Sequence, residues 1–146
     1  MDLLGSMKIS ASGLSANKKR MAAISSNIAN AQTTRTPEGG PYRKKEVVFG
    51  SEPARESFSD ILEGELGENA QKVHATDVIS VDKPPIYKYE PGHPDANEQG
   101  YVAYPDINVM EEMANMIETS RAYEANIAAL NTAKSMALKA LEIGKN

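Results

Sequence analysis

Apolar side chains recur every seven residues near the start of the chain. This stripe consists of Met7, Leu14, Met21 and Ile28, with Leu3 and Ile24 at the complementary offset. A helix presents such a stripe to a partner helix, so the pattern predicts a helix within residues 1–36. Residues 24–30 are rich in Ser and Asn, which compete for backbone hydrogen bonds. We therefore expect this helix to be weak alone and more stable when packed.

A second apolar pattern, alternating by four and three residues, covers the end of the chain. Its positions are Val109, Met113, Met116, Tyr123, Ile127, Leu130, Ala137 and Leu141, with Ser120 and Lys134 as polar members. Met110 and Ile117 belong to a further stripe that widens the apolar face beyond what one helix can cover. The pattern predicts a long helix within residues 106–146 that needs at least two neighbours, with Asp106 and Asn108 as candidate N-caps.

The prolines divide the chain into three segments. All eight lie between residues 37 and 105, together with seven of the ten glycines. Because proline costs about 3 kcal/mol inside a helix, both ends are free to be helical and the middle is not. The predicted fold class is mainly α with a small β insert. The terminal segments, 1–36 and 106–146, would pair as antiparallel, coiled-coil-like helices and form an assembly domain, with 37–105 as the outer insert.

The insert combines β-branched and aromatic runs with turn residues. The runs at 72–81 and 86–90 are separated by Asp82-Lys83-Pro84-Pro85, and this arrangement predicts a β-hairpin. The other expected elements are a third strand at 42–49, a short helix at 58–66 and a loop at 33–41.

Composition excludes several classes of protein. The chain of 146 residues has a formal charge of −4 and no cysteine, so it lacks the basic surface of a nucleic-acid binder, disulfides and thiolate chemistry. No apolar run is long enough to span a membrane, and the first residues do not resemble a cleaved secretory signal. Two antiparallel helices without a third layer bury little area, so we infer an obligate subunit of an assembly.

Candidate chemistry is sparse. The two histidines, His74 and His93, belong to no nucleophile–base set that spacing reveals. Residues 95–106 place oxygen-bearing side chains at several positions of a calcium loop, but Pro94 and Pro105 deny that loop its flanking helices. We predict a polar turn there, and no catalytic residue, metal or cofactor.

Both ends of the chain carry motifs of a known family. Residues 12–16 and 20–31 resemble the amino-terminal signature of the flagellar rod and hook axial proteins, and residues 33–43 resemble its proximal-rod members. The other end is similar to the same members in three segments, at 100–113, 120–126 and 131–141.

This resemblance implies a structural subunit of the bacterial flagellar basal body. Its expected partners are other copies of itself, other rod proteins and the flagellar type III export apparatus, which would deliver it without a cleaved signal peptide to a rod that crosses the periplasm. The expected partner-binding residues are Met7, Leu14, Met21, Ile24, Ile28, Met113, Met116, Tyr123, Ile127, Leu130 and Leu141.

Some alternatives stay open at this point. Phe58, Ile61 and Leu62 fit a short export motif of rod and hook substrates, but a short amphipathic helix without an export role explains them equally well. For function, the alternatives are another rod or hook axial protein, a peptidoglycan-acting enzyme and a cytoplasmic two-helix adaptor.

Overall fold

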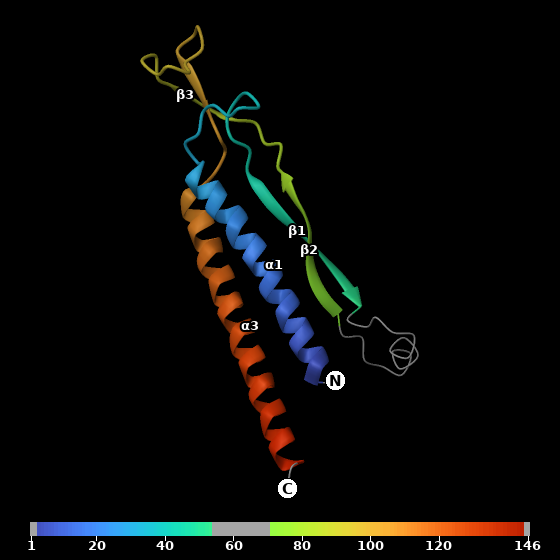
Figure 1. The fold of residues 1–146 in the computed structure, drawn as a ribbon. Helices are drawn as coiled ribbons and strands as arrows, with labels where there is room; N and C mark the ends of the chain where they lie inside the picture. The colour runs from blue at the N-terminus through green and yellow to red at the C-terminus, as the bar shows by residue number, and fades with distance from the viewer. Residues whose placement is uncertain (1–2, 54–70, 145–146) are drawn as a thin grey trace. The chain divides into compact units, whose positions relative to one another are not determined.

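Two long helices dominate the fold. The computed structural model describes residues 3–53 and 71–144, and its helices are α1 (Leu3–Ala29) and α3 (Val109–Ile143) (Figure 1). Four strands lie between them: β1 (Lys45–Pro53), β2 (Gln71–Ser80), β3 (Ile86–Tyr89) and β4 (Tyr101–Tyr104). The prediction of a mainly helical chain with a small β insert is confirmed. The short helix predicted at 58–66 lies outside the described residues.

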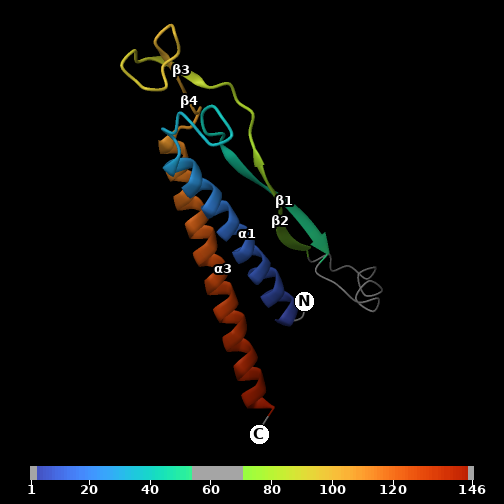
Figure 2. The same ribbon diagram turned by 45° about the horizontal axis from the view of Figure 1, so that its top comes forward.

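The chain forms two compact units. One consists of Met1–Lys19, Val48–Asp77 and Thr119–Asn146, and the other, called unit 2 below, of Arg20–Val47 and Val78–Glu118. Within each unit, the segments of α1 and α3 lie side by side and run in opposite directions (Figures 1 and 2).

The strands form two separate two-stranded sheets. β1 pairs with β2, and β3 pairs antiparallel with β4, so that Ile86 lies opposite Tyr104 and Tyr89 opposite Tyr101. The predicted hairpin between 72–81 and 86–90 is therefore wrong. Pro84 and Pro85 account for the difference, because each proline favours an extended residue before it and the segment therefore does not form a tight reversal.

The turn between β3 and β4 uses side chains that resembled calcium ligands in the sequence. Asn97 accepts hydrogen bonds through Oδ1 from the backbone N–H groups of Gln99 and Tyr101, and Gly100 takes a positive φ of 80°. Asp95 accepts a hydrogen bond from the Thr34 hydroxyl. These oxygens stabilise a tight turn, as the polar-turn interpretation predicted.

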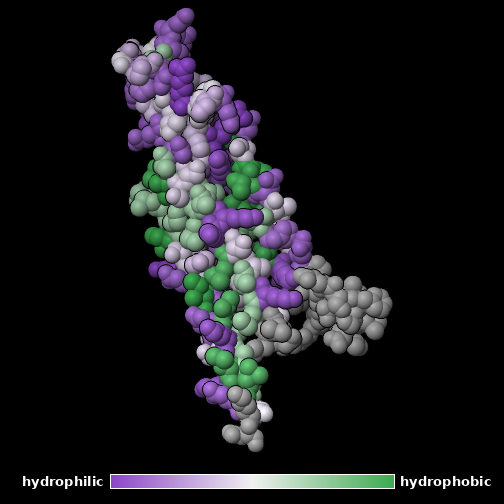
Figure 3. All heavy atoms as spheres, in the orientation of Figure 1, coloured by the Kyte–Doolittle hydropathy of each residue, from purple (hydrophilic) through white to green (hydrophobic). Residues whose placement is uncertain are grey.

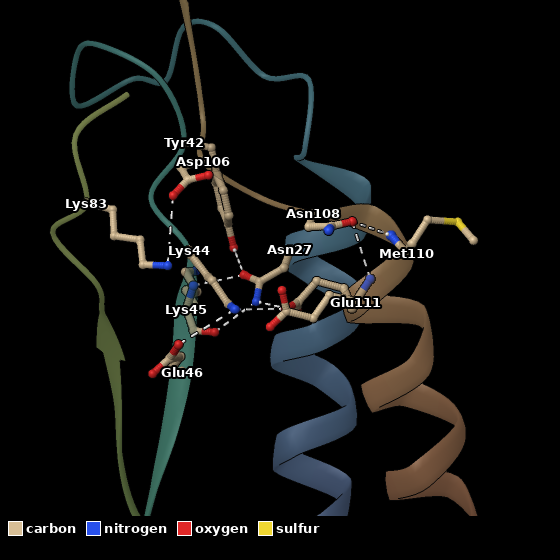
Figure 4. Close-up of polar contacts among 11 residues, drawn as sticks. Asn27, Tyr42, Lys44, Lys45, Glu46, Lys83, Asp106, Asn108, Met110 and Glu111 are labelled. Carbon is tan, nitrogen blue, oxygen red and sulfur yellow. Dashed lines mark hydrogen bonds and ion pairs between the residues drawn. The ribbon is translucent and has the colours of Figure 1, made fainter. Parts of the chain in front are cut away.

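The start of α3 is capped by the side chain of Asn108. Its Oδ1 accepts the backbone N–H groups of Met110 at 3.1 Å and Glu111 at 3.4 Å, the arrangement of an N-cap (Figure 4). The other candidate, Asp106, instead forms an ion pair with Lys83 at 3.8 Å. Only one of the two proposed N-caps is therefore used in the structure.

The described core is small and rich in small side chains. Its buried apolar members are Ala16, Ala23, Ile24, Val102 and Ala133. Three polar residues, Asn27, Glu112 and Thr119, are buried with them. Large hydrophobic side chains are instead exposed on α3 and on the strands, and hydrophobic residues are visible at the surface in Figure 3.

Candidate assembly surface and buried polar cluster

Small and polar residues make the close contact between the helices. A Cβ atom added at Gly13 would lie 3.1 Å from the Asn126 amide nitrogen, which is tighter than ordinary van der Waals contact. The buried residues Ala16 and Ala23 lie on α1, and Thr119 and Ala133 lie on α3. Because these side chains are short, the two helices can approach each other closely and leave larger apolar residues of α3 exposed.

The predicted partner-binding residues differ in their exposure. On α1, Ile24 is buried, whereas Met7, Leu14, Met21 and Ile28 are half-buried. On α3, Met116, Tyr123 and Leu130 are half-buried, and Met113, Ile127 and Leu141 are exposed. The possible export residues Phe58, Ile61 and Leu62 lie outside the described residues. A role of these positions in assembly stays a prediction.

Large apolar side chains on α3 remain uncovered. We use the name α3 apolar stripe for eight exposed large apolar residues of α3, which lie on more than one side of the helix: Met110, Met113, Ile117, Ile127, Met136, Leu138, Leu141 and Ile143. Their exposed fractions reach 75% at Met110 and 78% at Ile143. An uncovered apolar surface of this kind is typical of a protein that buries it against a partner.

The packed side of α3 combines a row of small and polar residues with Met116, Tyr123 and Leu130 of the predicted face. Glu112, Thr119, Asn126 and Ala133 face inward or are half-buried, and they precede Met113, Ser120, Ile127 and Lys134 by one residue each. The packed side therefore includes part of the predicted face, whereas Met113, Ile127 and Leu141 of that face are exposed.

A buried polar cluster joins α1, α3 and the start of β1 within unit 2. The Asn27 side chain is 1% exposed and fills its hydrogen-bonding capacity. Its Nδ2 donates to the Lys45 carbonyl and to Glu112 Oε2, both at 2.9 Å. Its Oδ1 accepts the Lys45 N–H at 2.8 Å and the Tyr42 hydroxyl at 3.2 Å (Figure 4).

The carboxylate of Glu112 is the buried charge of this cluster. The residue is 2% exposed, and its Oε1 lies 2.9 Å from Lys44 Nζ, whose side chain is 16% exposed. A charge removed from water is tolerated when it is paired and hydrogen-bonded, and both oxygens of Glu112 have partners. We call Asn27, Tyr42, Lys44, Lys45 and Glu112 the Asn27 cluster.

The charges around Lys44 favour its protonated form. Partial burial lowers the pKa of Lys44, but the hydrogen bond and negative charge of Glu112, with Glu46 and Glu111, outweigh burial and raise the pKa above 10.5. Similarly, the hydrogen bond from the Tyr104 hydroxyl to Glu90 raises the pKa of Tyr104 above 10.0.

This pKa shift predicts a loss of stability at alkaline pH. Since the pKa of Lys44 is higher in the folded than in the unfolded chain, its stabilisation is fully present below 10.5 and lost as pH rises through the folded value. The difference in unfolding free energy between the native chain and Lys44→Met should therefore be constant near neutrality and shrink above pH 10.5. Urea titrations at a series of pH values measure this difference, and a difference that grew with pH would contradict the pairing.

Sequence reasoning missed the Asn27 cluster. Asn27 was interpreted as a weak helix former and as part of the family motif at 20–31, and Lys44 fell within the strand expected at 42–49. The one available signal was the position of Asn27, seven residues after Arg20 and four after Ala23, on a helix face rich in small residues. That signal does not identify a partner.

Other kinds of site are not found among the described residues. No group of three or more His, Asp or Glu side chains within residues 3–53 and 71–144 could hold a metal ion. In that part of the chain, neither helix combines the length and apolar character needed to cross a membrane.

Two family descriptions match the ends of the chain. Residues 7–35 match the family described as "Flagella basal body rod protein", and residues 98–143 match "Flagellar basal body rod FlgEFG protein C-terminal". The chain is thus of the class of flagellar basal-body rod proteins.

Similar proteins narrow this class. The chain is 41% identical to the flagellar basal-body rod protein FlgC of Salmonella typhimurium and 40% identical to that of Bacillus subtilis, over 99% of this chain and 100% of each relative. It is 39% identical to FlgC of Borreliella burgdorferi, over 98% of both chains. The chain belongs to the FlgC family.

Family membership decides between the functional alternatives. The prediction of a structural flagellar rod subunit is confirmed, and so is the prediction that it is not an enzyme, because the relatives are structural basal-body rod proteins. The resemblance at residues 33–43 is to the same basal-body rod proteins as the relatives, which are named FlgC. The chain acts in the flagellar basal-body rod with other rod proteins.

Proposed function

We propose that this rod subunit becomes fully ordered only when neighbouring subunits cover the α3 apolar stripe. The uncovered side chains of that stripe, from Met110 to Ile143, are the observation that carries the proposal. Within each unit, the described segment of α1 packs beside α3 and leaves these side chains exposed. The partners would be further copies of the chain and other rod proteins.

The energetics favour folding coupled to assembly. Ordering a residue costs about 1–2 kcal/mol of backbone entropy, and the described apolar core contributes mainly alanines, Ile24 and Val102. Burying a Leu, Ile or Met side chain contributes about 1.5–3 kcal/mol. The eight residues of the α3 apolar stripe, which are 38–78% exposed, would each supply part of this contribution once neighbours cover them. A weakly ordered monomer also suits passage through a narrow export channel.

We further propose how the segments are used in the rod. The helical ends, 1–36 and 106–146, would pair in a coiled-coil-like manner and form the inner tube around the channel, with 37–105 on the outside. The flagellar type III apparatus would deliver the chain without a cleaved signal peptide, and Phe58, Ile61 and Leu62 are candidates for its recognition. The apolar character of α3 and the clustering of proline between the helices support this division.

An export experiment tests this proposal. We expect an epitope-tagged chain to co-purify with hook–basal bodies in its own cells, and to disappear from them when flagellar export is blocked. In parallel, circular dichroism of the isolated chain should show helix content that rises with protein concentration. Unchanged location after the export block would favour a cytoplasmic adaptor, and full helix content at high dilution would contradict coupled folding.

A further inference from the structure

The contacts between α1 and α3 follow one register. Gly13 meets Asn126, and Asn27 meets Glu112. Residues 13 and 27 are fourteen apart on α1, and residues 112 and 126 are also fourteen apart on α3, which is two heptads on each helix. The Gly13 contact lies within the first unit and the Asn27 contact within unit 2, and each fits antiparallel pairing in this register.

Packing of side chains alone would permit a second register. Glu112 is followed at heptad intervals by Thr119, Asn126 and Ala133, all of them small or polar. If α3 moved by one heptad, Gly13 would face Ala133 and Asn27 would face Thr119. The residues that would meet Gly13 and Asn27 after this shift are therefore again small.

The Asn27 cluster is what distinguishes the two registers. In the observed register, Asn27 and Lys44 occupy both oxygens of the buried Glu112 carboxylate. In the shifted register, Glu112 would lie opposite residue 34, beyond the end of α1 at Ala29, and would lose its bond to Asn27. A buried polar group that finds its partners in only one register specifies that register.

The backbone of β1 fixes the position of Asn27 in turn. The Asn27 amide bonds both the N–H and the carbonyl of Lys45, so it pairs with the first residue of β1 as a neighbouring strand would. Tyr42 adds a bond to Asn27 Oδ1 and one of 2.9 Å to the Ser26 hydroxyl. Three segments far apart in the sequence are thereby held at one place along the helices.

We propose that Asn27, Lys44 and Glu112 are register-determining residues, which select the register in which α1 pairs with α3. The register sets the axial position of the α3 apolar stripe, and therefore where neighbouring subunits can contact it. The selection of a register does not depend on the proposal of coupled folding, whereas its consequence for neighbouring subunits rests on that proposal. A shifted α3 would present each apolar residue of the stripe one heptad away from its binding position.

Cysteine cross-linking measures the register directly, because the chain has no cysteine of its own. The pair Gly13→Cys with Asn126→Cys reports the observed register, and Gly13→Cys with Ala133→Cys reports the shifted one. Each full-length variant is expressed as the only copy in its cells, oxidised, and separated without reductant to distinguish looped monomers from dimers. We expect the first pair to form at least tenfold more intramolecular disulfide than the second.

Moving the glutamate by one heptad tests the cause. The double variant Glu112→Thr/Thr119→Glu moves the carboxylate to residue 119, which lies opposite Asn27 in the shifted register. Disulfide formation should then favour the cysteine pair at residues 13 and 133. The control Glu118→Thr/Ala125→Glu moves an exposed glutamate by one heptad and should keep the native preference. An unchanged preference after Glu112 is moved would overturn the inference. Closure of neither pair, or closure only between two chains, would overturn it as well.

Discussion

Replacing Lys44 with Met should lower the free energy of unfolding of unit 2 by about 3–5 kcal/mol. The substitution removes the cation that lies 2.9 Å from Glu112, whereas the carboxylate, which is 2% exposed, stays in place. Removing one partner of a buried ion pair is costly because the remaining charge is left without compensation. Hydrogen exchange of the amides in residues 20–29 and 109–118 measures this loss of stability.

Two further variants separate the charge from other effects of the substitution. Lys45→Met changes the neighbouring, exposed lysine, whose ammonium lies 5.9 Å from the centre of the Tyr42 ring, and should cost less than about 1 kcal/mol. Lys44→Met combined with Glu112→Leu removes both partners and should recover a large part of the stability. Equal losses of unfolding free energy in Lys44→Met and Lys45→Met would show that the buried Glu112 carboxylate is not stabilised by Lys44.

The sequence predicted the helices better than the strands because different information determines them. The absence of proline outside residues 37–105 and the heptad spacing of Met7, Leu14 and Met21 are local signals, and a helix forms from local hydrogen bonds. Strand pairing joins segments that are distant in the sequence. The run at 72–81 was identified as a strand, but nothing local shows that it pairs with β1 instead of β3.

The candidate site was accessible from the sequence only in part. A wide apolar face on the last helix was predicted, and the structure leaves Met113, Ile127 and Leu141 of that face exposed. The Asn27 cluster was not predictable, since residues 27, 44 and 112 come from three elements and each residue type has a more common surface role. Its detection required the positions of all three elements.

Replacing Ile117 or Met136 with Asp should abolish rod assembly while the isolated chain stays soluble. Both side chains are more than half exposed, so a carboxylate there is solvated in the free subunit and leaves the pairing of α1 with α3 intact. A neighbouring subunit that covered this position would have to bury an unpaired charge, which costs several kcal/mol. Swimming on soft agar and electron microscopy of basal bodies report the loss of rods.

A matched substitution on the same helix completes this experiment. Thr132→Asp introduces the same carboxylate at an exposed polar position whose heptad neighbours, Ala125 and Lys139, do not belong to the α3 apolar stripe, and it should leave swimming unchanged. Ile127→Asp lies within the stripe and within the predicted partner-binding set, so it should behave as Ile117→Asp does. If all these variants assembled normal rods, the stripe would not be a subunit contact. A role in assembly requires that the free subunit tolerate the charge. If the free Asp variants had less helix than the native free chain, the exposed residues would instead stabilise the monomer, and the proposed assembly contact would be contradicted.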